Sequence, residues 1–278
     1  MPEQCKLPES KSAKIVSVTA YDSILILTIE TATRAGSVCL ARGNNVIVAR
    51  TGDPNVSQSA HLLQQLEELL AEANASIRDV ELFAAAAGPG SFTGLRIGLA
   101  TLKAFAAVLD RPCVGIQTLH AIAHAAGYSK RTVAMLPAGR GEVFWQMFET
   151  SERGIVRALS KAGHSEPQEL IGQLATSRAL VWAGDGARLY AEQITERARQ
   201  EKLALLDDED EFGKNESGKA IVNEENAWRL AAPVANLAKH VSALALERYR
   251  IGDHGDAKDL QAIYVRLSDA EIKQQCPA

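Results

Sequence analysis

Gly88-Pro89-Gly90-Ser91-Phe92-Thr93-Gly94-Leu95-Arg96-Ile97-Gly98 connects the apolar run Leu82–Ala87 directly to an apolar helical segment. Gly88 and Gly90 allow a positive φ or the close approach of another group, and Thr93 is placed to cap the helix. A helix that begins in such a loop presents free amides and the positive end of its dipole. The stretch predicts a strand–loop–helix joint whose glycines serve an anion, a docking partner or the close packing of the helix on a sheet.

Two phosphate-binding motifs fail on the spacing of these residues. A dinucleotide fingerprint that starts at Gly88 needs its third glycine at position 93, where Thr93 stands. A P-loop needs Gly-Lys-Ser/Thr, but Gly94 is followed by Leu95 and Arg96. The stretch therefore matches neither of these phosphate sites.

The composition is typical of a globular protein with a sizeable core. The chain has 278 residues, of which 46% are apolar, and this suggests one large or two ordinary domains. Its longest apolar runs are too short to span a bilayer, and residues 1–20 contain no signal-peptide core. Cys5, Cys39, Cys113 and Cys276 are scattered, which indicates neither a zinc site nor a disulfide framework. We expect a cytoplasmic protein that has no membrane contact.

The charge distribution argues against independent binding of RNA. The formal net charge is −4, and the largest basic cluster is the pair Lys130-Arg131. Because neutralising phosphates requires a basic face, we expect any contact with nucleic acid to need the help of another component. The charged segment 207–226 is predicted to be a mobile acidic loop, and residues 1–21 a disordered leader.

Hydrophobic periodicity predicts a similar plan twice along the chain. The first half is predicted to contain strands at Ser23–Ile29, Gly36–Arg42, Asn45–Arg50, Leu82–Ala87 and Cys113–Ile116, and helices at His61–Ala73 (capped by Ser59), at Gly94–Leu109 and through Ile122 and Ala126. The second half is predicted to contain strands at Thr132–Leu136, Glu142–Phe148, Gly154–Leu159, Ala179–Ala183 and Gln261–Val265, and helices at Glu169–Ala175, Ala187–Arg199 and Val234–Tyr249.

Such an order indicates an α/β fold with two related halves and a cleft between them. We place an N-terminal α/β domain, which carries the Gly-rich loop and helices for dimerisation, at residues 22–128. A C-terminal α/β domain follows at residues 129–268, and residues 269–278 form a tail. The helix at 234–249 is expected to pack back on the first domain.

Five segments carry a resemblance to one family. They are Ile26-Leu27-Thr28-Ile29-Glu30-Thr31-Ala32-Thr33, Gly88–Gly98 as quoted above, Gly115-Ile116-Gln117-Thr118-Leu119, Gly141-Glu142-Val143 and Tyr264-Val265-Arg266. From about Ser23 to Lys273 the chain resembles the bacterial TsaB family of tRNA threonylcarbamoyladenosine biosynthesis proteins, within the superfamily of actin, sugar kinases and heat-shock chaperone ATPases.

The resemblance implies both a fold and a role. The fold would be two ribonuclease H-like halves with mixed sheets flanked by helices. The role would be a scaffold or regulatory subunit that binds TsaD, its catalytic paralogue. With the accessory ATPase TsaE, such a complex transfers threonylcarbamoyl from threonylcarbamoyl-AMP to N6 of the tRNA adenosine next to the anticodon.

The turns that hold nucleotide in ATP-using members of the superfamily are altered here. Those members carry Asp-x-Gly-Ser/Thr after the first strand of each half, whereas this chain has Glu30-Thr31-Ala32-Thr33 and Pro137-Ala138-Gly139. The first turn lacks the glycine that approaches phosphate, and the second lacks a carboxylate to orient magnesium. Arg140 also stands one place later than in the Asp-Ala-Arg of the family. We expect no cofactor and no catalytic residue, with Glu30 a polar cap at a strand end.

Histidines offer a metal site on spacing alone. His120 and His124 stand four apart on a predicted helix. In the paralogue two histidines four apart follow the equivalent strand, and alignment puts them at Thr118 and Ile122, two residues away. Two residues turn a helix by about 200°, so the pair here points elsewhere. We expect surface or packed histidines, no bound metal, and a capping, packing or interface role for His61.

A dimerising scaffold is the function that these observations favour. The two predicted helices before and after the Leu82–Ala87 strand are apolar over broad faces, as a shared subunit interface requires. Leu66→Asp or Arg96→Glu should weaken the complex and leave the monomer folded, and a homodimer would imitate the complex. The expected interface residues are His61, Leu62, Gln65, Leu66, Leu69, Gly90, Ser91, Phe92, Thr93, Arg96 and Leu99.

Two other functions remain open at this point. One is a stand-alone ATP-dependent kinase or acyltransferase, which the fold favours and the altered turns disfavour. The other is a metallopeptidase-like protein, for which the sequence offers no complete ligand set.

Overall fold

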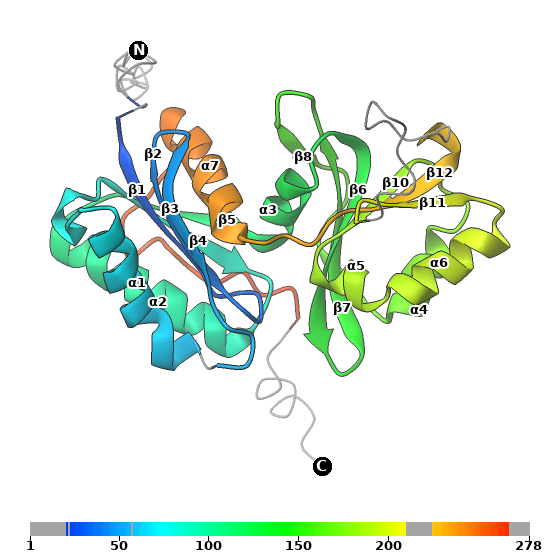
Figure 1. Ribbon diagram of the computed structural model, residues 1–278, viewed down its shortest axis with the longest axis horizontal. Helices are drawn as coiled ribbons and strands as arrows, with labels where there is room; N and C mark the ends of the chain where they lie inside the picture. The colour runs from blue at the N-terminus through cyan, green and yellow to red at the C-terminus, as the bar shows by residue number, and fades with distance from the viewer. Residues whose placement is uncertain (1–20, 22, 57, 210–223, 267–278) are drawn as a thin grey trace, which may run out of the picture.

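A computed structural model describes residues 21, 23–56, 58–209 and 224–266. Two sheets with their helices lie side by side along the long axis of the molecule, and two further helices lie between them (Figure 1). The mixed α/β fold expected from the sequence is confirmed. Apart from Tyr21, the predicted leader lies outside the described residues, as do the tail and most of the acidic loop.

The first sheet has the strand order β3-β2-β1-β4-β5. Strands β1, β2 and β3 form an antiparallel meander, and β4 and β5 run parallel to β1. Helices α1 and α2 cover one face of this sheet, and α7 covers the other (Figure 1). The bounds are β1 Leu25–Glu30, β2 Ser37–Arg42, β3 Asn45–Thr51, α1 Gln58–Glu72, β4 Leu82–Gly88, α2 Phe92–Leu109, β5 Cys113–Gln117 and α7 Leu237–Arg250.

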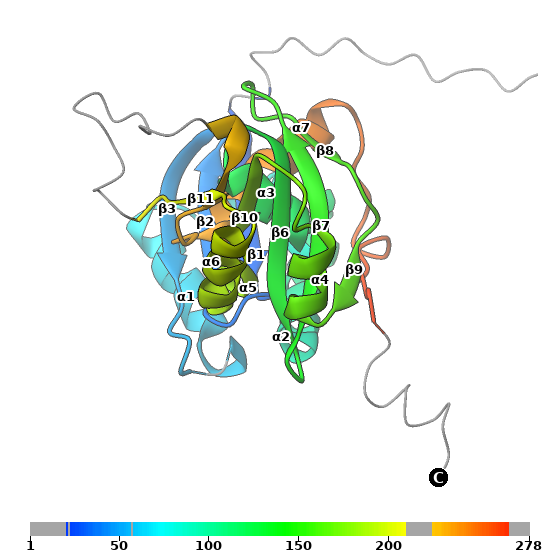
Figure 2. The same cartoon turned by 90° about the vertical axis from the view of Figure 1, so that its right-hand side faces the viewer.

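The second sheet has the order β11-β12-β10-β6-β7-β8, and β9 pairs with β7. Helices α4 and α6 cover its outer face (Figure 2). Trp182 and Trp228 pack edge to face at 5.2 Å between ring centroids in the core under these helices. The bounds are β6 Ser129–Gly139, β7 Glu142–Thr150, β8 Val156–Ala158, β9 Gly163–Ser165, α4 Pro167–Gln173, β10 Leu180–Ala183, α5 Asp185–Leu189, α6 Ala191–Gln200, β11 Ala204–Asp207 and β12 Ala227–Leu230.

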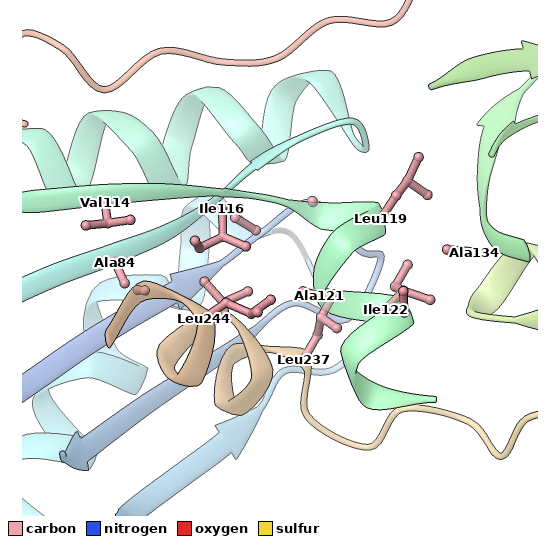
Figure 3. Close-up of a cluster of buried hydrophobic side chains, with 14 of the residues drawn as sticks. Ala84, Val114, Ile116, Leu119, Ala121, Ile122, Ala134, Leu237 and Leu244 are labelled. Carbon is pink, nitrogen blue, oxygen red and sulfur yellow. The ribbon is translucent and has the colours of Figure 1, made fainter. Parts of the chain in front are cut away.

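A central layer joins the two sheets. Helix α3 (Thr118–Ala125) packs against α7, β6 and β7, and α7 packs on β1 and β2. Figure 3 shows Val114 and Ile116 of the first sheet, Leu119 and Ile122 of α3, and Ala134 of the second sheet in one buried cluster. The apolar core therefore continues from one half into the other.

Three expectations about the elements are wrong, and two strands were not predicted. Residues 261–265 form no strand, because they run between the two sheets and are not paired along either. The predicted helix at 187–199 is two helices that meet at Tyr190. Ser59 lies inside α1 and does not cap it. Strands β11 and β12 border the acidic segment, whose charge concealed them.

The glycines of the strand–loop–helix joint serve close packing. A Cβ on Gly94 would lie 2.0 Å from the Thr31 carbonyl oxygen, and one on Gly98 would lie 2.2 Å from Thr31 Oγ1. A Cβ on Gly90 would lie 2.5 Å from the Ala32 carbonyl oxygen. These glycines therefore let α2 lie directly against the loop after β1. The sequence left three roles open for them, namely an anion, a docking partner and close packing, and the structure shows the close packing.

Gly94→Ala should destabilise the protein by about 1–3 kcal/mol, since the added methyl group meets backbone that cannot rotate away. Gly172 in α4 is the matched control, because a Cβ there meets nothing within 4 Å. Gly172→Ala should be neutral or stabilise by up to about 1 kcal/mol. Urea unfolding followed by circular dichroism measures both changes. Equal stability of the two variants would show that the close contact at Gly94 does not constrain α2.

Candidate functional site

Helix α2 begins at a capped turn that is bonded to the loop after β1. Ser91 is the N-cap, and its Oγ accepts a hydrogen bond from the Gly94 amide at 3.2 Å. The Ser91 amide donates to the Ala32 carbonyl oxygen at 2.8 Å. The prediction that Thr93 caps the helix is wrong, because Thr93 lies in the first turn. The joint is thus tied to the loop after β1 at the place where an anion would approach.

Glu30 ends β1 as a buried carboxylate that its own loop satisfies. Its Oε1 accepts from the Thr33 amide at 2.7 Å, and its Oε2 accepts from Thr33 Oγ1 and Ser37 Oγ, each at 2.9 Å. Ser37 Oγ in turn accepts from the Ala238 amide at the start of α7 at 3.0 Å. Glu30 therefore joins the loop after β1 to α7, as the polar cap that the sequence predicted.

The electrostatics of Glu30 follow from this burial. Glu30 is 1% exposed, and burial raises its pKa above 4.5, although the hydrogen bonds from Thr33 and Ser37 oppose the shift. Both oxygens accept hydrogen bonds from the protein, so the carboxylate fixes the loop after β1 against β2.

A cavity of about 490 Å³ opens between the two halves beside the first turn of α2. Thr33 and Ser91 line it from the first half, and Pro137 and Leu189 line it from the second. Asp185 is the one carboxylate among its lining residues. The volume lies in the range of ligand sites.

Two of the histidines considered as metal ligands meet different partners. His124 Nδ1 lies 2.9 Å from Nδ1 of His240 on α7, and the ring of His120 packs on Phe148 at 5.6 Å. Burial lowers the pKa of all three histidines, that of His240 to about 4. In the described part of the chain no three His, Cys, Asp or Glu residues are grouped to hold a metal ion. His240 was not predicted as a neighbour of His124, and it is the packing of α3 on α7 that brings the two rings together.

The expected interface residues divide into two sets. Leu62, Leu66, Leu69 and Leu99 are buried in the core beneath α1 and α2. The expectation that Leu66→Asp leaves the monomer folded is therefore wrong, because Leu66 is only 3% exposed. The exposed or half-buried residues are His61, Gln65, Gly90, Ser91, Phe92, Thr93 and Arg96.

Sequence reasoning missed two apolar side chains on the outer surface of these helices. Leu63 on α1 is 59% exposed, and Val108 near the end of α2 is 83% exposed. Leu63 follows the buried Leu62 directly, about 100° around the helix, and a run of leucines at neighbouring positions does not show which of them faces the core.

Lowering the pH from neutral to 4.5 should stabilise the wild type relative to Glu30→Gln. The folded state binds a proton at Glu30 while the unfolded carboxyl is still ionised, so the free energy of unfolding rises as the pH falls through this window. Thermal melts of both proteins at several pH values, followed by circular dichroism, give the difference in Tm. A difference that does not change with pH would mean that folding leaves the pKa of Glu30 where it was.

Comparison with known proteins gives the family. The model of the family "TsaD: tRNA N6-adenosine threonylcarbamoyltransferase" matches residues 54–184. YeaZ from Pseudomonas aeruginosa has a similar structure, with a TM-score of 0.64 and 22% identity, and the match covers 87% of this chain and 99% of that one. This likeness supports an actin-like ATPase or ribonuclease H-like fold for each half.

Curated relatives carry the assignment. The tRNA threonylcarbamoyladenosine biosynthesis protein TsaB of Haemophilus influenzae is 29% identical over 241 residues, which cover 81% of this chain and 92% of that protein. TsaB of Escherichia coli is 32% identical over 161 residues, which cover 54% of this chain and 69% of that protein. On this identity, coverage and fold, the chain belongs to the TsaB family, whose members are named for the biosynthesis of threonylcarbamoyladenosine in tRNA.

Proposed function

We propose that this chain is a non-catalytic partner subunit in the transfer of threonylcarbamoyl to N6 of the tRNA adenosine next to the anticodon. It binds a TsaD-like catalytic subunit, and a TsaE-like ATPase completes the complex. Its relatives carry the name of the pathway, and a tRNA N6-adenosine threonylcarbamoyltransferase from Rhizobium johnstonii is 39% identical over 79 residues. The similarity to that transferase supports a partner of related fold.

The observation that carries a non-catalytic role is the state of the two turns. Glu30 is held by Thr33 and Ser37, and the second turn offers Pro137 in place of a carboxylate. Neither turn presents an acidic oxygen to a metal–nucleotide complex. The donor of the threonylcarbamoyl group and its activation are therefore assigned to the partner.

Support for a partner comes from the outer surface of α1 and α2, here called the docking face. Helix α2 is, by length and composition, apolar enough to cross a membrane, yet 33% of it is buried within the molecule. Its exposed surface carries the small residues Ala100, Ala104 and Ala107, which let a second helix approach closely. A specific interface of this kind buries roughly 1,200–2,000 Å² in total.

The same face suits a second copy of the chain, because a homodimer would present a related fold to it. The net charge of −4 supports contact with tRNA only within the complex. These features, together with the biosynthetic role of the relatives, support action in the cytoplasm.

Leu63→Asp should weaken binding to the TsaD-like subunit at least tenfold, since it places a charge at an exposed apolar position of the docking face. Ile155→Asp is the matched control, because Ile155 is also 59% exposed but lies in the second half. Titration calorimetry with the purified subunit gives the Kd, and circular dichroism checks that both variants fold. Equal affinities for the two variants would place the partner on another surface.

Reconstitution tests the role itself. Transfer of threonylcarbamoyl to tRNA by the purified TsaD-like and TsaE-like proteins should require this chain. Leu63→Asp should reduce the transfer in proportion to its loss of binding, and Ile155→Asp should not. Mass spectrometry of the digested tRNA measures the modified nucleoside. Transfer by this chain without the TsaD-like subunit would contradict the proposal.

A further inference from the structure

The chain ends its described part as a strap, residues 251–266, which leaves α7 and runs along the first half to the second (Figure 1). Gly255 and Cys113 exchange two backbone hydrogen bonds of 2.9 and 3.1 Å, and the Leu260 side chain is buried beside Gly115. The Ile263 amide donates to the Ala87 carbonyl oxygen at 2.7 Å. The strap is thus fixed to the end of β4, where the glycine-rich joint begins.

The far end of the strap is attached to the second half. Arg266 forms an ion pair with Glu142, the first residue of β7, and donates to the Ala138 carbonyl oxygen at 3.1 Å. A Cβ on Gly88 would lie 2.4 Å from the Ile263 carbonyl oxygen, so the joint and the strap fit each other closely. Tyr264 therefore lies between two anchored positions, Ile263 and Arg266.

Tyr264 belongs to a stack of three side chains at the start of α2. Its ring lies 5.5 Å from the ring of Phe92, and Arg96 Cζ lies 3.8 Å from the centroid of the same Phe92 ring. Tyr264 is 49% exposed, and Arg96 is exposed as well. A cation, an aromatic ring and a phenol are held together at the surface, next to the docking face.

The guanidinium of Arg96 has a defined chemistry in this position. Its Cζ lies over the Phe92 ring, and this cation–π contact is the interaction that the described residues give it. A guanidinium presents a planar fork of N–H donors that matches a carboxylate bidentately. Arginine and tyrosine are also the residues that dominate the binding energy of interfaces.

We propose that the Arg96–Phe92–Tyr264 stack is the anchor of the docking face, and that the strap supplies part of it. The occupant is the TsaD-like subunit, which places a carboxylate on Arg96 and an adjacent apolar side chain on Tyr264. This inference rests on the proposed function and adds the chemistry of the partner. Continuity with the exposed surface of α2 and the positive charge of Arg96 argue for this occupant.

The strap positions Tyr264 before the partner arrives. Because backbone and side-chain contacts hold Ile263 and Arg266, little ordering of Tyr264 remains for binding to impose. Glu142→Gln removes the charge that holds Arg266 without touching the stack. Glu142→Gln should raise the Kd less than Tyr264→Ala does. Because the strap then detaches from the second half more often, amide exchange at residues 263–266 should increase.

Calorimetric titration of the full chain into the purified TsaD-like subunit tests the anchor. Arg96→Gln and Tyr264→Ala should each raise the Kd at least tenfold. Arg96→Lys should raise the Kd less than Arg96→Gln does, because lysine keeps the positive charge but lacks the planar N–H donors of the guanidinium. Tyr128→Ala is the control, since Tyr128 is 55% exposed and directly precedes β6 of the second sheet, away from α2. The wild-type Kd should rise with salt more steeply than that of Arg96→Gln, as a carboxylate partner requires.

The outcomes separate the two proposals. If the wild type binds and both Arg96→Gln and Tyr264→Ala bind within twofold of it, the anchor is overturned and the proposed function stands. If the wild type does not bind, the proposed function fails and the anchor with it. A third outcome is a wild-type homodimer, seen by light scattering, that Arg96→Gln and Tyr264→Ala no longer form. If the same variants still bind the TsaD-like subunit with unchanged affinity, the occupant is a second copy of the chain, which overturns the inference.

Discussion

The contact between the glycine face of α2 and the loop after β1 is the constraint on which the rest of the structure depends. Gly94 and Gly98 admit the two oxygens of Thr31, so the helix lies as close to the sheet as backbone allows. At the start of the helix the Ser91 amide bonds to the Ala32 carbonyl oxygen and the Gly94 amide bonds to Ser91 Oγ, while Ala100, Ala104 and Ala107 are exposed further along α2.

The same loop joins the first sheet to the central layer. Glu30 turns inward to Thr33 and Ser37, and Ser37 passes the connection on to α7. The carboxylate thus holds the loop, the sheet and the central layer together. A shared fold does not imply a shared reaction, so the role of this loop follows from its own contacts.

Sequence patterns predicted the parts of the molecule that depend on local periodicity. The strand at Leu82, the apolar helix after it and the repeated α/β plan were all predicted. Leu66 and Leu63 mark where this reasoning stops: both are leucines on one helix, and only packing shows that the first is core and the second is surface. The His124–His240 pair was equally hidden, because its members are 116 residues apart in the chain and meet only when α3 packs on α7.

Residues 261–265 were wrongly predicted to form a strand. The same tertiary contacts that prevent a strand here also place Tyr264 beside Phe92. An extended, partly apolar segment resembles a strand when judged alone. In the structure its residues serve different neighbours: Ile263 bonds to the end of β4, Tyr264 packs on Phe92, and Arg266 pairs with Glu142. A strand repeats one set of bonds along one partner, whereas a segment between two halves takes a different contact at each residue. The position of Tyr264 beside α2 therefore depends on the tertiary fold, and local sequence preference carries no signal for it.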